Sequence, residues 1–518
     1  MDLSSFLEVH PEIDSIIEHC RDVWVLLLTS FTVIIRIYLT SKTIASLHNI
    51  MEKETQQTEL IEKEDVCVHS TPKTLGTVIS LPPELWLEIF HHATFRPHSR
   101  DITPSDPFQP QPLPHNAMSL NTVAASMQTK STIVQVCRLW RAIATELLYE
   151  HITVYSPWRA RKILTAMALS RCSDPIPDAS GEARKSFNLL FVPGSHGQWA
   201  RRIDICAHTR FTTRSYIRYI MDIFHILRHC PQLRALSMSF RFGVPEEFQT
   251  AVSQLYGQSL IGLAWDGLTI QNPCSSHAFV QSFQALRVLD IRSISTLMLD
   301  DNHITHVLPC VRELLVSSEI SSLEFAGALE LPALRRVVFT RREKLREDSY
   351  IHALESFLRL HGSRIVDLEV DLPPCHYNLP IFRVSHFLRP EGCPNLEQLV
   401  FHSIEPAVVD IPTPHQALRR IGLRGVKIER LYDSADSNLY GVKAHMKSFN
   451  HTLFPRLEIV RTVGFLVASS VDELAIDVFI AWTEYFEKEG IDLQDGEGVV
   501  WLYAEPDPYS KGPRYMRE

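Results

Sequence analysis

The sequence has few of the features that nucleotide, metal or nucleic-acid sites require. Only 19 of its 518 residues are glycine, and Gly-x-x-x-x-Gly-Lys-Ser/Thr, Gly-x-Gly-x-x-Gly and Gly-x-Ser-x-Gly do not occur. Phosphate-binding loops and nucleophile elbows therefore have no support in the sequence. Basic side chains number 51 and acidic ones 60, so there is no cationic excess to hold a nucleic-acid backbone.

The ten cysteines are scattered without a Cys-x-x-Cys pair, which argues against zinc fingers and ribbons and favours a reducing compartment. His225 and His229 are four residues apart on a predicted helix but lack the Glu of a His-Glu-x-x-His site, so we interpret them as packing residues. We predict no catalytic residue, metal ligand or cofactor, and we expect that the protein is not an enzyme and binds no nucleic acid.

Long apolar runs are scarce. The one candidate, Val23 to Leu39, has 17 residues and contains Arg36. It is at the short limit for a bilayer, so a buried or amphipathic helix and a membrane anchor both remain open. If the run inserts, Arg36 and Lys42 favour a body that faces the cytosol. This run and a charged linker make up an N-terminal region, 1–77, and we expect a cytoplasmic or nuclear location.

Two helical segments follow, separated by a proline-rich stretch. The first begins at Leu81-Pro82-Pro83, where proline suits a first helical turn, and its apolar residues Leu85, Ile89 and Phe90 recur at helical spacing. Six prolines between positions 97 and 114 then predict a solvated loop, about 96–116. Residues 131–151 carry a second apolar stripe at helical spacing, which includes Val136, Cys137 and Trp140.

These two segments resemble an F-box, in particular those of the F-box proteins abundant in mushroom-forming fungi. The resemblance covers about 78–152 and departs from a compact F-box in its proline-rich insertion. It implies a three-helix module that docks on a Skp-type adaptor and thereby recruits a cullin-RING ubiquitin ligase. By motif position, the implied adaptor surface is Leu81, Pro82, Leu85, Ile89, Phe90, Val136, Cys137 and Trp140. Each of these side chains alternatively belongs to the module's own core.

After a connector, 153–195, the chain repeats a phrase of the form Leu-x-x-Leu-x-apolar. Eight copies begin 22 to 31 residues apart, and their first residues are Leu233, Leu260, Leu286, Val311, Leu334, Ile365, Leu396 and Leu418. The spacing predicts one short parallel strand per repeat, with helices such as 215–229 and 348–361 returning along the outside. The copies resemble irregular leucine-rich repeats. The fold class is therefore α plus an α/β solenoid: a small helical F-box module followed by an irregular leucine-rich-repeat array over 196–470. Unrelated strands of an ordinary α/β domain are the alternative.

A solenoid presents a long concave face on which a partner binds. Charged and polar residues at the variable positions of the phrases are the target-binding candidates, although plain solvated surface also accounts for them. They are Arg234, Ser237, Arg287, Asp290, Arg335, Arg336, Asp367, Glu369, Glu397, Gln398, Arg419 and Arg420. An amphipathic helix and tail, 471–518, would close the array.

The sequence thus predicts the substrate-recognition subunit of an SCF-type ubiquitin ligase, with a Skp-type adaptor on the F-box and an unknown protein target on the repeats. The alternative is a non-catalytic scaffold or membrane-tethered interaction protein whose F-box-like segment does not bind the adaptor.

Overall fold

The structure is a computed structural model of all 518 residues. By internal contacts the chain divides into Met1–Ser80 and Leu81–Glu518, and the structural description applies to the second unit. The described ranges are 81–94, 102, 106–109, 123–170, 191–207, 213–240, 244–266, 278–294, 306–340, 347–371, 384–404, 411–427, 431, 441–467 and 473–502. The apolar run 23–39 lies outside them, and within them no helix has the length and apolarity to span a membrane.

The unit begins with a three-helix module made of α2 (Pro83–Ala93), α3 (Val123–Val136) and α4 (Arg138–Glu150). Proline occupies the first position of α2, where a missing amide hydrogen costs nothing. The buried core of the module is small: Phe90, Ile133, Ala144 and Leu147. Between α3 and α4 the backbone of Cys137 is extended, and its Sγ accepts a hydrogen bond from the Trp140 amide at 3.4 Å. Cys137 therefore ends one helix and caps the next.

A parallel sheet of twelve strands follows, in sequence order apart from the omission of β6 and β8. Its strands are β1 (His151–Val154), β2 (Arg202–Ala207), β3 (Ala235–Phe240), β4 (Gly262–Asp266), β5 (Val288–Asp290), β7 (Glu313–Ser317), β9 (Arg336–Thr340), β10 (Asp367–Asp371), β11 (Gln398–His402), β12 (Arg420–Arg424), β13 (Ile459–Arg461) and β14 (Asp492–Gln494). The short strands β6 (His306–Val307) and β8 (Leu329–Glu330) pair separately.

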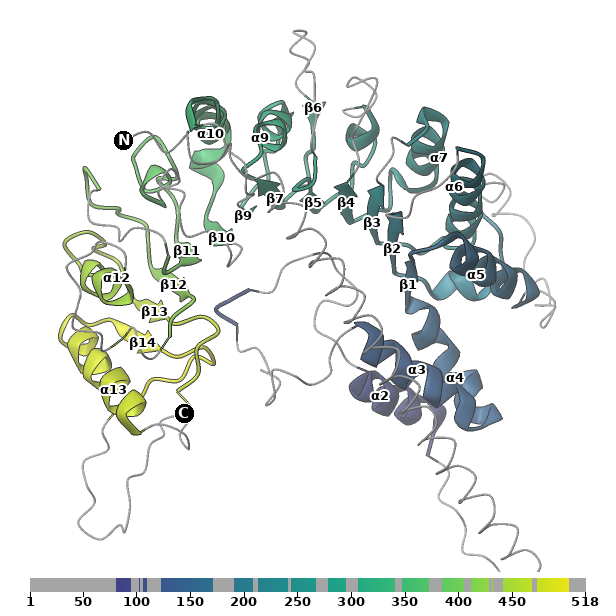
Figure 1. Ribbon diagram of the computed structural model, residues 1–518, viewed down its shortest axis with the longest axis horizontal. Helices are drawn as coiled ribbons and strands as arrows, with labels where there is room; N and C mark the ends of the chain where they lie inside the picture. The colour runs from purple at the N-terminus through teal and green to yellow at the C-terminus, as the bar shows by residue number, and fades with distance from the viewer. Residues whose placement is uncertain are drawn as a thin grey trace, which may run out of the picture. The chain divides into compact units, whose positions relative to one another are not determined.

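Helices return along the outer side of the arc that the strands line (Figure 1). They are α5 (Pro157–Ser170), α6 (Thr213–Arg228), α7 (Glu246–Tyr256), α9 (Ile320–Gly327), α10 (Glu347–His361), α12 (Val442–Ser448) and α13 (Glu473–Lys488), with single 3₁₀ turns at His196–Trp199, Gly362–Arg364 and Val384–His386. This mixture of helices and parallel strands is an α/β solenoid-like repeat fold. The helices predicted over 215–229 and 348–361 correspond to α6 and α10.

The repeated phrase accounts for the register of the sheet. The second residue of every strand is a buried aliphatic residue, from Ile152 in β1 to Leu493 in β14, and each pairs with the second residue of the next strand. Because side chains alternate along a strand, the first and third residues face the opposite side. We call this surface, formed by the first and third residues of the twelve strands, the concave face.

The array is longer than the predicted 196–470. It begins at His151, inside the range predicted as F-box and connector, because α4 runs directly into β1 and the Arg201 amide bonds to the Glu150 carbonyl at 2.8 Å. It ends at β14, because α13 packs its buried Phe479, Ile480 and Phe486 against the core and returns to one more strand. The helix predicted to close the array is thus followed by a further strand.

The prediction of a solvated loop over about 96–116 fails at the residues that the structure describes there. Pro107 and Phe108 are buried and Ile102 is partly buried, because all three contact the repeat array.

Candidate functional site

Two surfaces of the described chain are candidates for binding partners: the helical module and the concave face. On the module, the predicted adaptor residues separate into buried and exposed sets. Phe90 is 2% exposed, and its ring centroid lies 4.9 Å from that of Trp140 and 5.6 Å from that of Trp86. The prediction that Phe90 faces an adaptor is therefore corrected: this ring forms the core, and the half-buried Trp140 packs on it.

The other predicted residues of the module remain available to a partner. Leu85 is 50% exposed, Ile89 45% and Val136 57%, while Pro82 and Cys137 are exposed and Leu81 is partly buried. Leu139, which the sequence analysis did not single out, is 51% exposed. Leu85 and Ile89 lie on one side of α2 because they are four residues apart, and Pro82, the residue before the helix, is three residues from Leu85. Val136, Cys137 and Leu139 lie where α3 meets α4. We call these six residues the exposed apolar set.

The concave face changes character along its length. Its middle is apolar, with Val288, Leu315 and Val338 forming a small buried cluster of their own on three neighbouring strands. Next to this cluster the charges alternate: Arg336 in β9 lies 4.0 Å from Glu313 in β7 and 3.2 Å from Glu369 in β10. Arg424 in β12 also pairs with Glu369. Each charge is thus partly neutralised by a neighbour on another strand.

A cavity of about 370 Å³ lies beside this ladder of charges. Its walls are Asp106, Pro107, Gln109, Arg312, Glu313, Arg335, Arg336, Asp367, Leu368, Glu369, Gln398 and Val400. One oxygen of Asp367 is buried there without a hydrogen-bond partner. Burial raises the pKa of the Asp367 carboxyl, and the charge of Arg336 offsets part of this shift. The cavity therefore combines cationic side chains with a carboxylate that is poorly solvated.

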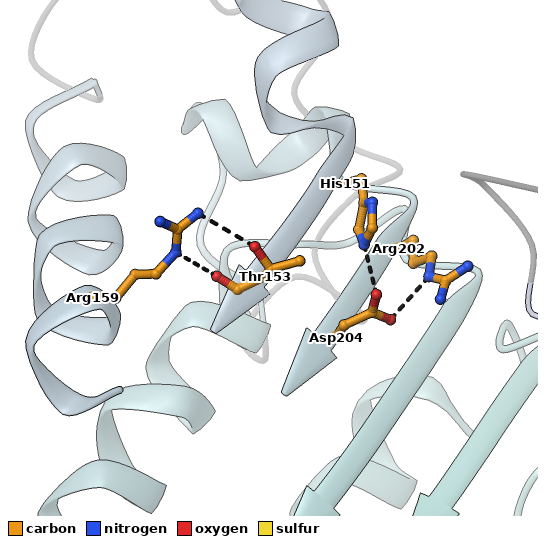
Figure 2. A network of polar contacts seen from close by, with 5 residues as sticks. All are labelled: His151, Thr153, Arg159, Arg202 and Asp204. Atoms are coloured by element: carbon orange, nitrogen blue, oxygen red, sulfur yellow. Dashed lines mark hydrogen bonds and ion pairs between the residues drawn. The ribbon is translucent and has the colours of Figure 1, made fainter. Parts of the chain in front are cut away.

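The first strands carry a different polar network, which Figure 2 shows. The ring nitrogen Nε2 of His151 lies 2.7 Å from Oδ2 of Asp204, and Nε of Arg202 lies 2.9 Å from Oδ1 of the same carboxylate. Burial raises the pKa of Asp204, but the hydrogen bond to His151 and the charge of Arg202 more than offset it, so the pKa is below its usual value. Arg159 of α5 donates to the Thr153 carbonyl at 2.7 Å. These contacts join β1, β2 and α5 where the array begins.

Seven of the predicted target-binding residues are first or third residues of strands and so belong to the concave face: Ser237, Asp290, Arg336, Asp367, Glu369, Gln398 and Arg420. The other five immediately precede the first residue of a strand and are exposed: Arg234, Arg287, Arg335, Glu397 and Arg419. Arg335 still borders the cavity. The site prediction missed Arg461, the third residue of β13. Alternation outward from the buried second residue is the signal that would have found it.

Within the described ranges, no group of three or more His, Cys, Asp or Glu side chains is arranged to hold a metal ion.

No protein-family model matches the chain, and no curated protein does. Among solved structures, the chain is similar to a chain of the crystal structure of the Rad7 and Elc1 complex in yeast. The identity is 12%, the match covers 72% of this chain and 98% of that chain, and the TM-score is 0.21. A TM-score of this size carries no argument, so the proposals that follow depend on the chain's own residues.

Proposed function

We propose that the chain is a non-catalytic substrate receptor of a cullin-RING ubiquitin ligase. The helical module binds a Skp-type adaptor, which links the chain to the cullin, and the repeat array binds the protein target. The chain itself forms no covalent intermediate; it brings the target close to the ligase, and proximity supplies the kinetic effect. In this role it works in the cytosol or the nucleus.

The observation that carries the proposal is the exposed apolar set on a module whose core is complete without it. Three aromatic rings of the core contact one another: Phe90, Trp86 and Trp140. By contrast, about half of the surface of Leu85 and of Ile89 is exposed to solvent. Full burial of such a side chain is worth about 1.5 to 3 kcal/mol. Burying the exposed half against a partner then contributes about 1 kcal/mol for each residue.

Five of the six residues of the exposed apolar set, all but Leu139, are residues that the F-box resemblance assigns to the adaptor; Leu81, Phe90 and Trp140 are assigned by the resemblance alone. The resemblance and the burial pattern are separate arguments, because the first uses motif position and the second uses solvent exposure. They agree on Pro82, Leu85, Ile89, Val136 and Cys137.

Adaptor capture tests the proposal directly. The intact chain and a Leu85→Glu, Ile89→Glu variant are immobilised, and recovery of a Skp-type adaptor and a cullin from purified components is measured. We expect the intact chain to capture both proteins and the variant to capture neither, because two charges in an apolar contact are not compensated.

Leu169→Glu is the matched control, since Leu169 in α5 is 66% exposed and lies outside the module. It adds one glutamate, where the variant adds two, to a different surface, and we expect unchanged capture. If the folded intact chain captures no adaptor, the receptor proposal is wrong and the scaffold interpretation takes its place.

A further inference from the structure

The insertion between the two halves of the module contacts the concave face of the array. Ile102 packs against the buried cluster of Val288, Leu315 and Val338. A Cβ on Gly262 in β4 would lie 3.4 Å from Cδ1 of Ile102. One aliphatic side chain from outside the array thus covers the apolar middle of the concave face, over strands β4, β5, β7 and β9.

A short turn farther along the insertion occupies the next part of the face. The Phe108 amide donates to Oδ1 of Asp106 at 2.9 Å, and the Gln109 amide donates to the Asp106 carbonyl at 3.2 Å. This turn buries Pro107 and leaves Phe108 only 8% exposed. In Figure 1 it is the short purple stretch on the inner side of the arc, facing β12.

Arg461 of β13 holds this turn. Its Nη1 donates to the Pro107 carbonyl at 3.3 Å, and its guanidinium carbon lies 5.4 Å from the centre of the Phe108 ring, within cation–π range. Nε and Nη2 bond to Oε1 of Gln494 at 3.1 and 2.6 Å. Gly498, which has a φ of +89°, leaves room for the guanidinium, because a Cβ there would lie 2.6 Å from Nη2. Arg461 is 6% exposed and held on both sides.

Asp106 brings a negative charge to the concave face. Its carboxylate borders the cavity whose walls include Arg312, Arg335 and Arg336. Burial lowers the pKa of Arg461, and the charge of Asp106 offsets part of this shift. The cavity therefore receives an acidic side chain next to a buried aromatic ring.

These contacts have the character of a bound ligand. The core of the array is complete without the insertion, because Ile102 and the cluster beneath it are separate from the main core. The insertion contacts the face through an aliphatic anchor, an acidic residue and an aromatic anchor. Proline-rich sequence surrounds these anchors, and a long loop costs little more entropy to close than a shorter one.

We propose that Ile102 and residues 106–109 are an internal ligand of the concave face, and that the target carries a segment of the same chemistry. That segment has an aliphatic residue, an acidic residue four positions later, then proline and an aromatic residue. The target and the insertion compete for the same surface. The inference rests on the proposed receptor function in one respect, that the competing segment belongs to the target of the ligase. Binding of such a segment to the concave face does not depend on the adaptor.

Peptide binding in trans tests the inference. The probe is a fluorescein-labelled peptide of residues 100–111, and its anisotropy is measured with three full-length proteins. These are the wild type, an Ile102→Asp, Phe108→Asp variant whose insertion lacks its anchors, and the exposed-site control Leu169→Asp, which lies in α5 outside the insertion and the concave face. A peptide in which the residue equivalent to Phe108 is alanine serves as the specificity control.

We expect the double variant to bind the probe, and the wild type and the Leu169→Asp control to bind it about tenfold more weakly. A tethered segment at an effective concentration of about 1 mM reduces the apparent affinity of a peptide with a Kd of about 100 µM by about this factor. The alanine peptide should not bind. Equal binding by wild type and double variant, or no binding by a double variant with a normal circular dichroism spectrum and thermal unfolding, overturns the inference.

Hydrogen exchange on the wild type gives an independent result if the double variant does not fold. Excess labelled peptide, distinguished by its mass, should displace the chain's own residues 106–109 from the concave face and so accelerate their amide exchange. Unchanged exchange at saturating peptide would contradict competition between the peptide and the insertion. Adaptor capture separates the two proposals, because these substitutions leave the exposed apolar set intact. If the double variant does not bind the peptide but the wild type captures the adaptor, the internal ligand alone is rejected. If the double variant binds the peptide but the wild type captures no adaptor, the receptor role alone is rejected.

Discussion

Replacing Phe90 by alanine is expected to unfold the helical module and leave the repeat array folded. Phe90 is 2% exposed and contacts both Trp86 and Trp140. A buried Phe→Ala change costs about 3 to 5 kcal/mol. A core as small as that of this module rarely supplies more than about 3 to 5 kcal/mol in total. One substitution therefore removes most of the stability of the module.

Leu85→Ala is the matched comparison, because Leu85 is 50% exposed on the same helix. We expect it to change the stability of the module by less than about 1 kcal/mol. Burial of the exposed half of Leu85 against the adaptor contributes about 1 kcal/mol. Its loss in Leu85→Ala should therefore weaken adaptor binding about fivefold. The two substitutions thus separate folding from binding within one helix.

Hydrogen exchange of the amides in α4, with calorimetric titration of the adaptor, measures both effects. In Phe90→Ala the first turns of α4 should exchange faster, while strands β3 to β12 keep their protection. Unchanged protection of α4 in this variant would show that the aromatic cluster does not hold the module together. A large loss of protection in Leu85→Ala would show that Leu85 is a core residue and weaken the adaptor argument.

Two further predictions concern the repeat array. Burial lowers the pKa of His361 to about 4, so the folded protein holds a neutral imidazole that takes up a proton with a pKa of about 6.5 on unfolding. The free energy of unfolding therefore falls as the pH drops. Between pH 7 and pH 5, urea titrations should show that the wild type loses about 2 kcal/mol more of this free energy than His361→Gln does. Equal losses would contradict a buried neutral ring. Gly425 has a φ of +69° and a Cβ there would collide with the His402 ring, whereas Gly490 has a φ of +72° and open space around it. Gly490→Ala should cost about 1 kcal/mol and Gly425→Ala clearly more; equal shifts in thermal unfolding would show that the His402 ring moves aside freely.

The sequence alone was sufficient for the repeated unit of the array. The phrase Leu-x-x-Leu-x-apolar predicted the strands because parallel strands buried on one face need an apolar residue at every second position. Leu236, Val337 and Ile421 all occupy the same buried row. Helical spacing likewise predicted α6 and α10. These signals are local, so they do not depend on which parts of the chain later meet.

Which residues of the site are exposed was decided by tertiary structure. Leu85 and Phe90 have the same apolar character and lie on the same helix, and only the packing of Trp140 against one side of α2 makes Phe90 core and leaves Leu85 in water. The position of the insertion was decided in the same way. Its prolines predict an open loop, and nothing local to Phe108 indicates that Arg461, 353 positions later in the sequence, binds the turn that contains it. Contacts over such a separation depend on the arc of the whole array, which no short sequence pattern encodes.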